Sequence, residues 1–338
     1  MEANEVRMVW GNVSDTPQYD RLRVALGDGD PAAATAIKDA LHERGILEVI
    51  QCYNTERLFR ALDEEIVDLL IYDYHMLDDK FVEVMQKIRR KEVGQNPFVT
   101  IIATIRDSKA ETVRRLIDAG VDDLIRVPVS IDRVFESIGK SAKRRRPFVV
   151  TYDYVGPARP TPRNAKKSTD AGVKVPNTLK SRAFEGVSED EIRAIVEQAV
   201  EQMVARQLET CGVEIDRLAK RVADNYASID GSDRNLAMRG NLGKMAEAAS
   251  NLQHRVNGTA SDGVSELAAT LITITQRILE APTGRAAVEV QLLSQLAAAV
   301  RMSLSIDPGA DPTIREIADT VGNFTRRSTH TEAHVSAA

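Results

Sequence analysis

The sequence has few of the residues that mark several special classes of protein. Its 338 residues include two cysteines. Cys52 and Cys211 lie far apart, which argues against a disulfide framework or a cysteine-based metal site. No apolar run approaches the ~18 residues that a membrane-spanning helix needs. The first fifteen residues carry acidic side chains and lack the apolar core of a signal peptide. We therefore expect a cytoplasmic protein without a membrane span.

The overall composition is that of an ordinary globular protein of more than one domain. Hydrophobic residues make up 43% of the chain and charged residues 28%, both usual for soluble domains. A chain of this length exceeds the size at which a single hydrophobic core normally stops growing. The net charge of −5 argues against a protein whose whole surface coats nucleic acid or membrane.

Positive charge is concentrated in one segment. Between Lys140 and Gly186 the chain has twelve Lys or Arg residues against three acidic ones, together with five prolines. This composition predicts a basic, proline-containing linker. Its KRRRP run at 143–147 has the charge of a phosphate-contacting arm, which keeps a DNA-binding transcriptional regulator as an alternative. Because the helices predicted after it lack a helix-turn-helix pattern, we do not expect DNA as a partner.

The residues from Leu22 to Lys140 alternate between short apolar runs and amphipathic stretches. The expected strands are 22–26, 47–52, 68–72, 98–104 and 122–127. The expected helices are 31–45, 54–64, 78–91, 107–120 and 130–143, where apolar residues recur at helical spacing. This alternation predicts a five-stranded parallel sheet with helices on both faces, a doubly wound α/β fold.

Oxygen-bearing side chains follow three of these predicted strands. Asp28 and Asp30 come after the first run, Asp73 after the third, and Thr104 closes the fourth. Ligands of such sheets bind beyond the carboxyl ends of the strands, so we expect these side chains at one site. Carboxylates are the ligands that Mg²⁺ prefers. A carboxylate beside Mg²⁺ can also attack phosphorus and form an aspartyl phosphate.

Several motifs appear in a family-specific order. They are the acidic cluster before Pro31, VDLLIYDYHM around Asp73, ATIRDS, AGVDDLIRVPVS and a closing helix. With them, residues 22–140 resemble the receiver domain of bacterial two-component response regulators, which has a flavodoxin-like fold. The resemblance implies phosphorylation of Asp73, Mg²⁺ held by Asp28, Asp30 and Asp73, and Thr104 as the switch hydroxyl, with Ala103 as the competing position. It also implies a histidine kinase or phosphotransfer protein as the upstream partner.

The sequence departs from the receiver pattern at three positions. Gly29 separates two acidic residues that the family carries side by side, and Leu77 stands where the family carries a proline after the D-x-x-M motif at 73–76. Val127 stands where the family carries a lysine, and an apolar side chain cannot pair with a phosphoryl group. A pseudo-receiver, in which Asp28, Asp30 and Asp73 are solvated turn residues, is therefore the competing interpretation.

The second half of the chain predicts helices alone. Ser188 and Glu191 form a capping box, and apolar residues afterwards recur at spacings of three and four. The clearest stripe is Met238, Leu242, Met245, Ala249, Leu252 and Val256. Such narrow stripes indicate helices packed in a bundle or across a dimer. Because the first helical pattern is much longer than the others, we predict a homodimer whose packing involves Ile215 and Leu218.

One histidine in this half has the sequence context of a phosphotransfer residue. His254, in QHRVNG, weakly resembles the phospho-accepting segments of histidine kinases and of phosphotransfer domains. It lies two residues off the apolar stripe, and Asn257-Gly258 reads as a helix end. We interpret His254 as an exposed residue at a helix end and keep a phosphorelay intermediate as an alternative.

Together these observations predict a signalling protein that is not an enzyme. A receiver or pseudo-receiver controls a helical module that acts through protein contacts. The expected parts are an N-terminal tail (1–20), a receiver-like domain (21–142), a linker (143–186), an all-α helical bundle (187–326) and a C-terminal tail (327–338).

Overall fold

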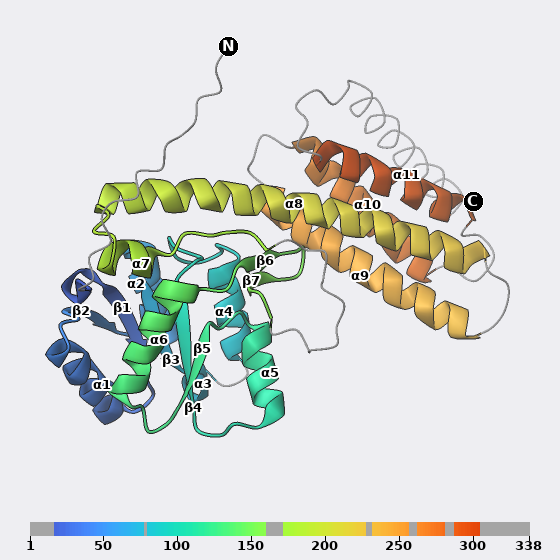
Figure 1. Ribbon diagram of the computed structural model, residues 1–338. Helices are drawn as coiled ribbons and strands as arrows, with labels where there is room; N and C mark the ends of the chain where they lie inside the picture. The colour runs from blue at the N-terminus through green and yellow to red at the C-terminus, as the bar shows by residue number, and fades with distance from the viewer. Residues whose placement is uncertain are drawn as a thin grey trace, which may run out of the picture. The chain divides into compact units, whose positions relative to one another are not determined.

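The computed structural model describes six stretches of the chain, residues 17–77, 80–159, 172–227, 232–256, 262–280 and 287–304. The chain divides into two compact units. The first unit comprises Met1–Val150 and Tyr154–Met203, and the second comprises Thr151–Asp153 and Val204–Ala338. Both are drawn in Figure 1.

The first unit is built on a five-stranded parallel sheet in the order β2-β1-β3-β4-β5 (Figure 1). Its strands are β1 (Arg23–Gly27), β2 (Glu48–Gln51), β3 (Leu69–Asp73), β4 (Thr100–Ile105) and β5 (Asp123–Arg126). Its helices are α1 (Pro31–Glu43), α2 (Thr55–Glu64), α3 (Tyr74–Leu77), α4 (Phe81–Arg89), α5 (Ala110–Asp118) and α6 (Ile131–Arg144). A short 3₁₀ turn, Tyr19–Arg21, precedes β1.

Apolar side chains cover both faces of this sheet. Leu70 and Ile101 are neighbours in register and pack into one core, while Ile71 and Ile102 pack into the other. Every residue of the central strand β3 is buried, as expected for a parallel sheet with helices on both sides. The predicted doubly wound α/β fold is confirmed.

Part of the segment expected to be a linker is folded in the first unit. It contains the antiparallel strands β6 (Phe148–Val150) and β7 (Val155–Pro157) and the helix α7 (Thr178–Ala183). Phe148 is fully buried, and its ring lies under the guanidinium groups of Arg89 and Arg145, 5.1 and 4.9 Å from its centroid. Leu179 packs into the core beside the sheet. Residues 160–171 lie outside the described part of the chain.

The long helix α8 (Glu189–Ala227) begins at the predicted capping box. Glu191 Oε2 accepts from the Ser188 N–H at 3.0 Å, and Ser188 Oγ accepts from the Glu191 N–H at 3.4 Å. Its first residues belong to the first unit, where Ile192 and Val196 pack against Ile66. From Val204 onward the helix belongs to the second unit.

The described part of the second unit is helical apart from the short segment Thr151–Asp153. After α8 come α9 (Ser232–Val256), α10 (Asp262–Glu280) and α11 (Ala287–Leu304). The stripe predicted on α9 lies in their common core, together with Leu267, Leu271 and Leu293. The helical region expected after the receiver is therefore present. Residues after 304, including the predicted C-terminal tail, lie outside the described residues.

The residues predicted to pack across a dimer are core residues of the chain itself. Ile215 and Leu218 are fully buried in the second unit. The choice of these two residues as an interface was therefore wrong, because α9, α10 and α11 together bury a stripe that α8 alone would leave exposed. None of the described helices is long and apolar enough to cross a membrane.

Candidate functional site

The four residues singled out in the sequence lie at or near the ends of neighbouring strands, at the carboxyl end of the sheet. Asp28 comes directly after β1, and Asp30 comes two residues later. Asp73 ends β3 and is in register with Thr104 of β4. β1 and β4 both pair with β3, so the topology brings these residues to one edge, as the strand-end argument predicts.

Asp73 is a buried carboxylate with few partners. The residue is only 2% exposed to solvent. Its Oδ1 accepts a hydrogen bond from the backbone N–H of His75 at 3.1 Å. Its Oδ2 lies 3.5 Å from Nη2 of Arg106, whose side chain is 59% exposed. A carboxylate in this setting can act as a nucleophile, since one oxygen carries only a long, solvent-facing ion pair.

Asp28 is half-buried beside the other two carboxylates. Burial raises the pKa of Asp28, and the negative charges of Asp73 and Asp30 raise it further, while the Asp30 N–H and Arg106 act against the shift. The negative charges of Asp28 and Asp73 thus repel each other at this edge of the sheet. A cation between them would relieve this repulsion.

Asp30 caps a helix. Its Oδ1 accepts from the Ala32 N–H at 2.9 Å at the start of α1, and the residue is exposed. No group of three potential metal ligands occurs among the described residues. Mg²⁺ in phosphoryl sites usually needs one or two protein carboxylates, the rest of its shell being water and phosphate oxygens. Asp28 and Asp73 fit this demand, whereas Asp30 is engaged in capping.

Thr104 has a buried hydroxyl group that lacks a partner. The residue is 1% exposed, and its Oγ1 has no hydrogen-bond partner in the described part of the chain. Because Thr104 pairs with Asp73, the two side chains share one face of the sheet. Ala103 pairs with Tyr72 and lies on the other face. Thr104 is therefore the residue of this strand end that can present a hydroxyl beside Asp73.

The position of the missing lysine is occupied by an exposed apolar side chain. Val127 is 37% exposed, and its N–H donates to the carbonyl of Ile105 at 2.9 Å. That hydrogen bond joins the end of β5 to the end of β4, one residue before Arg106. Arg106 was not predicted from the sequence, although a basic residue two positions after a predicted strand was the available signal.

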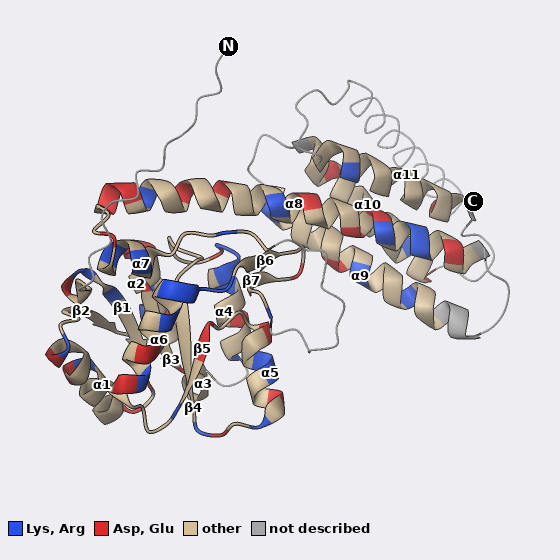
Figure 2. Cartoon of the chain, in the orientation of Figure 1, with Lys and Arg blue, Asp and Glu red and all other residues tan. Residues whose placement is uncertain are grey.

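The basic run at the end of α6 is engaged within the first unit. Figure 2 shows Lys and Arg gathered at this end of the helix. Arg145 donates to the Pro176 carbonyl at 3.1 Å and lies 3.4 Å from Asp122, and Arg146 donates to the Asp122 carbonyl at 2.8 Å. These contacts hold the chain after α6 against the sheet, so two of the four basic residues are not available as a DNA-binding arm.

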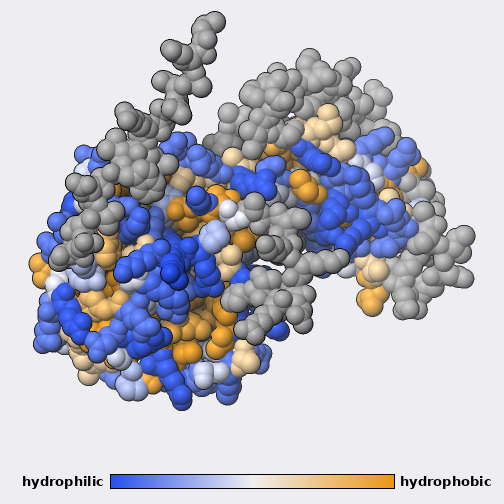
Figure 3. Space-filling model, in the orientation of Figure 1, coloured by the Kyte–Doolittle hydropathy of each residue, from blue (hydrophilic) through white to orange (hydrophobic). Residues whose placement is uncertain are grey.

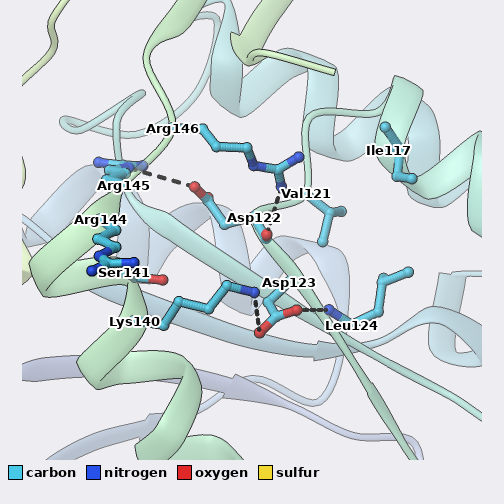
Figure 4. Close-up of a pocket in the computed structure, with 10 residues that line it drawn as sticks. All are labelled: Ile117, Val121, Asp122, Asp123, Leu124, Lys140, Ser141, Arg144, Arg145 and Arg146. Carbon is cyan, nitrogen blue, oxygen red and sulfur yellow. Dashed lines mark hydrogen bonds and ion pairs between the residues drawn. The ribbon is translucent and has the colours of Figure 1, made fainter. Parts of the chain in front are cut away.

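A cavity of about 350 Å³ lies beside this run, between α5, β5 and α6. Figure 4 shows that Arg145 and Arg146 reach toward Asp122, while Lys140 lies near Asp123. The cavity lies at the amino end of β5, away from Asp73. Lys140, Arg145 and Arg146 pair with acids and carbonyls of the same unit.

His254 lies in the last turn of α9 and is exposed. This placement agrees with the interpretation of an exposed residue at a helix end.

The comparisons with known proteins concern the first unit. Residues 24–139 match the family model of the response regulator receiver domain. A receiver domain protein from Methanospirillum hungatei is 22% identical over 36% of this chain and 92% of its own, with a TM-score of 0.32. A response regulator from Desulfuromonas acetoxidans is 24% identical over 36% of this chain and 97% of its own, with a TM-score of 0.33.

A putative pilus assembly protein from Burkholderia thailandensis is 18% identical over 36% of this chain and 99% of its own, with a TM-score of 0.32. A search of curated proteins finds no match. Residues 24–139, about a third of the chain, are a response regulator receiver domain.

Proposed function

We propose that this chain is an atypical response regulator whose receiver domain is phosphorylated on Asp73 and controls a helical protein-interaction module. The observation that carries the proposal is the pairing of a buried, sparsely bonded Asp73 with the partnerless hydroxyl of Thr104 on the same face of the sheet. Buried polar groups without partners are rare in folded proteins. A phosphoryl oxygen on Asp73 would supply the missing acceptor for Thr104 Oγ1.

The proposed reaction is a phosphoryl transfer to a carboxylate oxygen of Asp73. The oxygen attacks phosphorus, and the bond from phosphorus to the donor breaks, with its electron pair leaving on the donor. The donor is the phosphohistidine of a histidine kinase or phosphotransfer protein, or acetyl phosphate, which leaves as acetate. Mg²⁺ held by Asp28 and Asp73 would supply positive charge to the phosphoryl oxygens.

The helical module is the proposed output. Exposed apolar side chains of the second unit include Val213, Leu236 and Val288. Figure 3 shows hydrophobic residues scattered among hydrophilic ones on the visible face of this unit. We place the protein in the cytoplasm, as a signalling protein rather than an enzyme, with a protein as its downstream partner. A homodimer remains a prediction, which sedimentation of the full chain would test. Its proposed interface is now formed by these exposed side chains instead of Ile215 and Leu218.

Acetyl phosphate in the presence of Mg²⁺ tests the proposal. The intact mass of the full chain should increase by one phosphoryl group, and hydroxylamine should remove it because it cleaves acyl phosphates. Asp73→Asn should abolish the increase. Asp30→Asn is the matched control, since it changes an acid of the same site but keeps the helix cap, and it should still be labelled. An unchanged wild-type mass at millimolar donor would instead support a pseudo-receiver that acts by binding at the same face.

A further inference from the structure

A phosphoryl group on Asp73 carries about two negative charges in place of the carboxylate's one, where the sheet already ends in acidic residues. Asp28, Asp30 and Asp73 all lie at this edge. At short range such charges repel one another strongly unless positive groups lie between them. Mg²⁺ can neutralise part of the charge, but phosphoryl groups in proteins are usually also contacted by Arg or Lys side chains.

Arg106 is the cation that the structure places at Asp73. It directly follows the last residue of β4, two positions after Thr104. Its Nη2 lies 3.5 Å from Asp73 Oδ2, longer than a good charge-assisted hydrogen bond. Its side chain is 59% exposed, so the guanidinium group is free to move outward. A phosphoryl group on the Asp73 oxygen would occupy the space toward which Arg106 already extends.

The neighbouring strand β5 ends in Arg126, which is in register with Ile105 and therefore lies on the face of the sheet opposite to Thr104 and Asp73. Val127, hydrogen-bonded through its N–H to Ile105, has a partly exposed apolar side chain. Because Ile105 directly precedes Arg106, the side chains of Val127 and Arg106 lie at the ends of adjacent strands. A cation introduced at Val127 would therefore reach the same region as Arg106, which allows a rescue experiment.

We propose that Arg106 binds the phosphoryl group on Asp73 and supplies the positive charge that Val127 cannot. The inference rests on the proposed function, because it requires phosphorylation of Asp73. The guanidinium group presents a planar fork of donors that matches two phosphoryl oxygens. Arg106 thus exchanges a long ion pair with the carboxylate for two charge-assisted hydrogen bonds with the product.

The experiment measures the initial rate of labelling by acetyl phosphate and the lifetime of the phosphorylated chain after the donor is removed. Arg106→Met should lower the labelling rate by at least about tenfold, because the loss of each charged hydrogen bond has about that effect. Arg106→Lys, which keeps the charge without the fork, should lower it less. Arg133→Met is the matched control, since Arg133 is an exposed arginine on α6 paired with Glu136, and its rate should equal that of the wild type.

The double variant Arg106→Met with Val127→Lys should recover a rate within about threefold of the wild type, because a lysine there restores the charge. Labelling of the wild type with equal rates and lifetimes in Arg106→Met would overturn the role of Arg106 and leave the proposed function standing. Equal losses in Arg106→Met and Arg133→Met would overturn it too. Absence of labelling in the wild type would overturn the proposed function and this inference together.

Discussion

The two ends of the receiver sheet use charged side chains in opposite ways. At the amino end, Arg89 is fully buried and donates to the carbonyls of Pro97, Val99 and Gly120 and to Asp122. At the carboxyl end, Asp73 has one backbone hydrogen bond and one long ion pair. The donors of the Arg89 guanidinium group therefore all have acceptors. In contrast, a carboxylate oxygen of Asp73 and the hydroxyl group of Thr104 can each accept or donate further hydrogen bonds.

The difference indicates which end of the sheet stabilises the fold and which is available to a ligand. Asp68, at the amino end of β3, is fully buried and lies 2.7 Å from Arg182 Nε of α7. Arg182 also pairs with Glu189 at the start of α8. These ion pairs link the sheet to the segment after the receiver. The carboxyl end lacks such an attached segment in the described part of the first unit, and its groups form the proposed phosphorylation site.

The largest expected effect comes from removing a buried cation at the amino end. Arg89→Met leaves Asp122 without its closest partner and several carbonyls without donors. Breaking a buried pair on one side costs about 3–5 kcal/mol. We expect a loss of that size in the free energy of unfolding of the full chain, measured in urea by circular dichroism. The exposed Arg106→Met should change it by less than about 0.5 kcal/mol. Equal losses of unfolding free energy in Arg89→Met and Arg106→Met would contradict the view that the amino end of the sheet stabilises the fold more than the carboxyl end does.

The second prediction concerns pH and Asp68. Burial raises the pKa of Asp68 to about 6, against the lowering effect of the Arg182 guanidinium and the Arg23 N–H. The short ion pair to Arg182 would by itself favour the opposite shift, but complete burial outweighs it. Stability from a carboxyl with a raised folded pKa is fully present below the unfolded pKa near 3.8 and is lost as pH rises through about 6.

The wild type should therefore lose on the order of 2 kcal/mol more unfolding free energy than Asp68→Asn between about pH 4 and about pH 7. Urea unfolding of both proteins across this range gives the difference. A wild type that gains stability relative to Asp68→Asn as pH rises would mean that the pairing with Arg182 dominates over burial.

The third prediction strengthens the carboxyl end. A Cβ at Gly29 meets nothing within 4 Å, so Gly29→Asp should be tolerated and would place a carboxylate next to Asp28. Additional ligand charge raises the affinity for divalent cations, and we expect Mg²⁺ to bind about tenfold more tightly by calorimetry. Gly139→Asp, at an equally open position on α6, is the control. A similar gain in both variants would mean that general surface charge is responsible.

The smallest effect is expected at Asp30. Because its carboxylate caps α1, and Asn caps a helix as well as Asp does, Asp30→Asn should change the Mg²⁺ affinity by less than about twofold. Asp30→Ala should cost about 1 kcal/mol of stability through the lost cap. A large loss of Mg²⁺ affinity in Asp30→Asn would make Asp30 a ligand, as the sequence alone predicts.

The sequence predicts the sheet and its strand ends well because both follow from local patterns. Apolar runs of strand length fix β3 and β4, and the parallel arrangement then brings Asp73 and Thr104 to the same edge. The role of Asp30 was harder to predict, since an acid before Pro31 is the pattern of a metal ligand in this family and of a helix cap in any protein. Only the hydrogen bond to the Ala32 N–H distinguishes them.

The segment from 143 to 186 was harder to predict because its composition gives no information about the acidic residues with which its arginines pair. Arg145 and Arg182 look like solvated linker residues in the sequence, yet both are largely buried against Asp122 and Asp68. Those acids lie well before them in the chain, so local composition carries no signal for the pairing. Arg106 was missed for a similar reason, since its distance from Asp73 depends on strand register rather than on spacing along the chain.

The most direct test of the account locates the phosphoryl group in the chain. Borohydride reduces an aspartyl phosphate to homoserine, so the full chain is treated with acetyl phosphate and Mg²⁺, reduced, digested and mapped by peptide mass. The account predicts homoserine at position 73 and unmodified aspartate at Asp28 and Asp30. Unmodified Asp73 in the treated chain, or homoserine at position 28 or 30 instead, would contradict it.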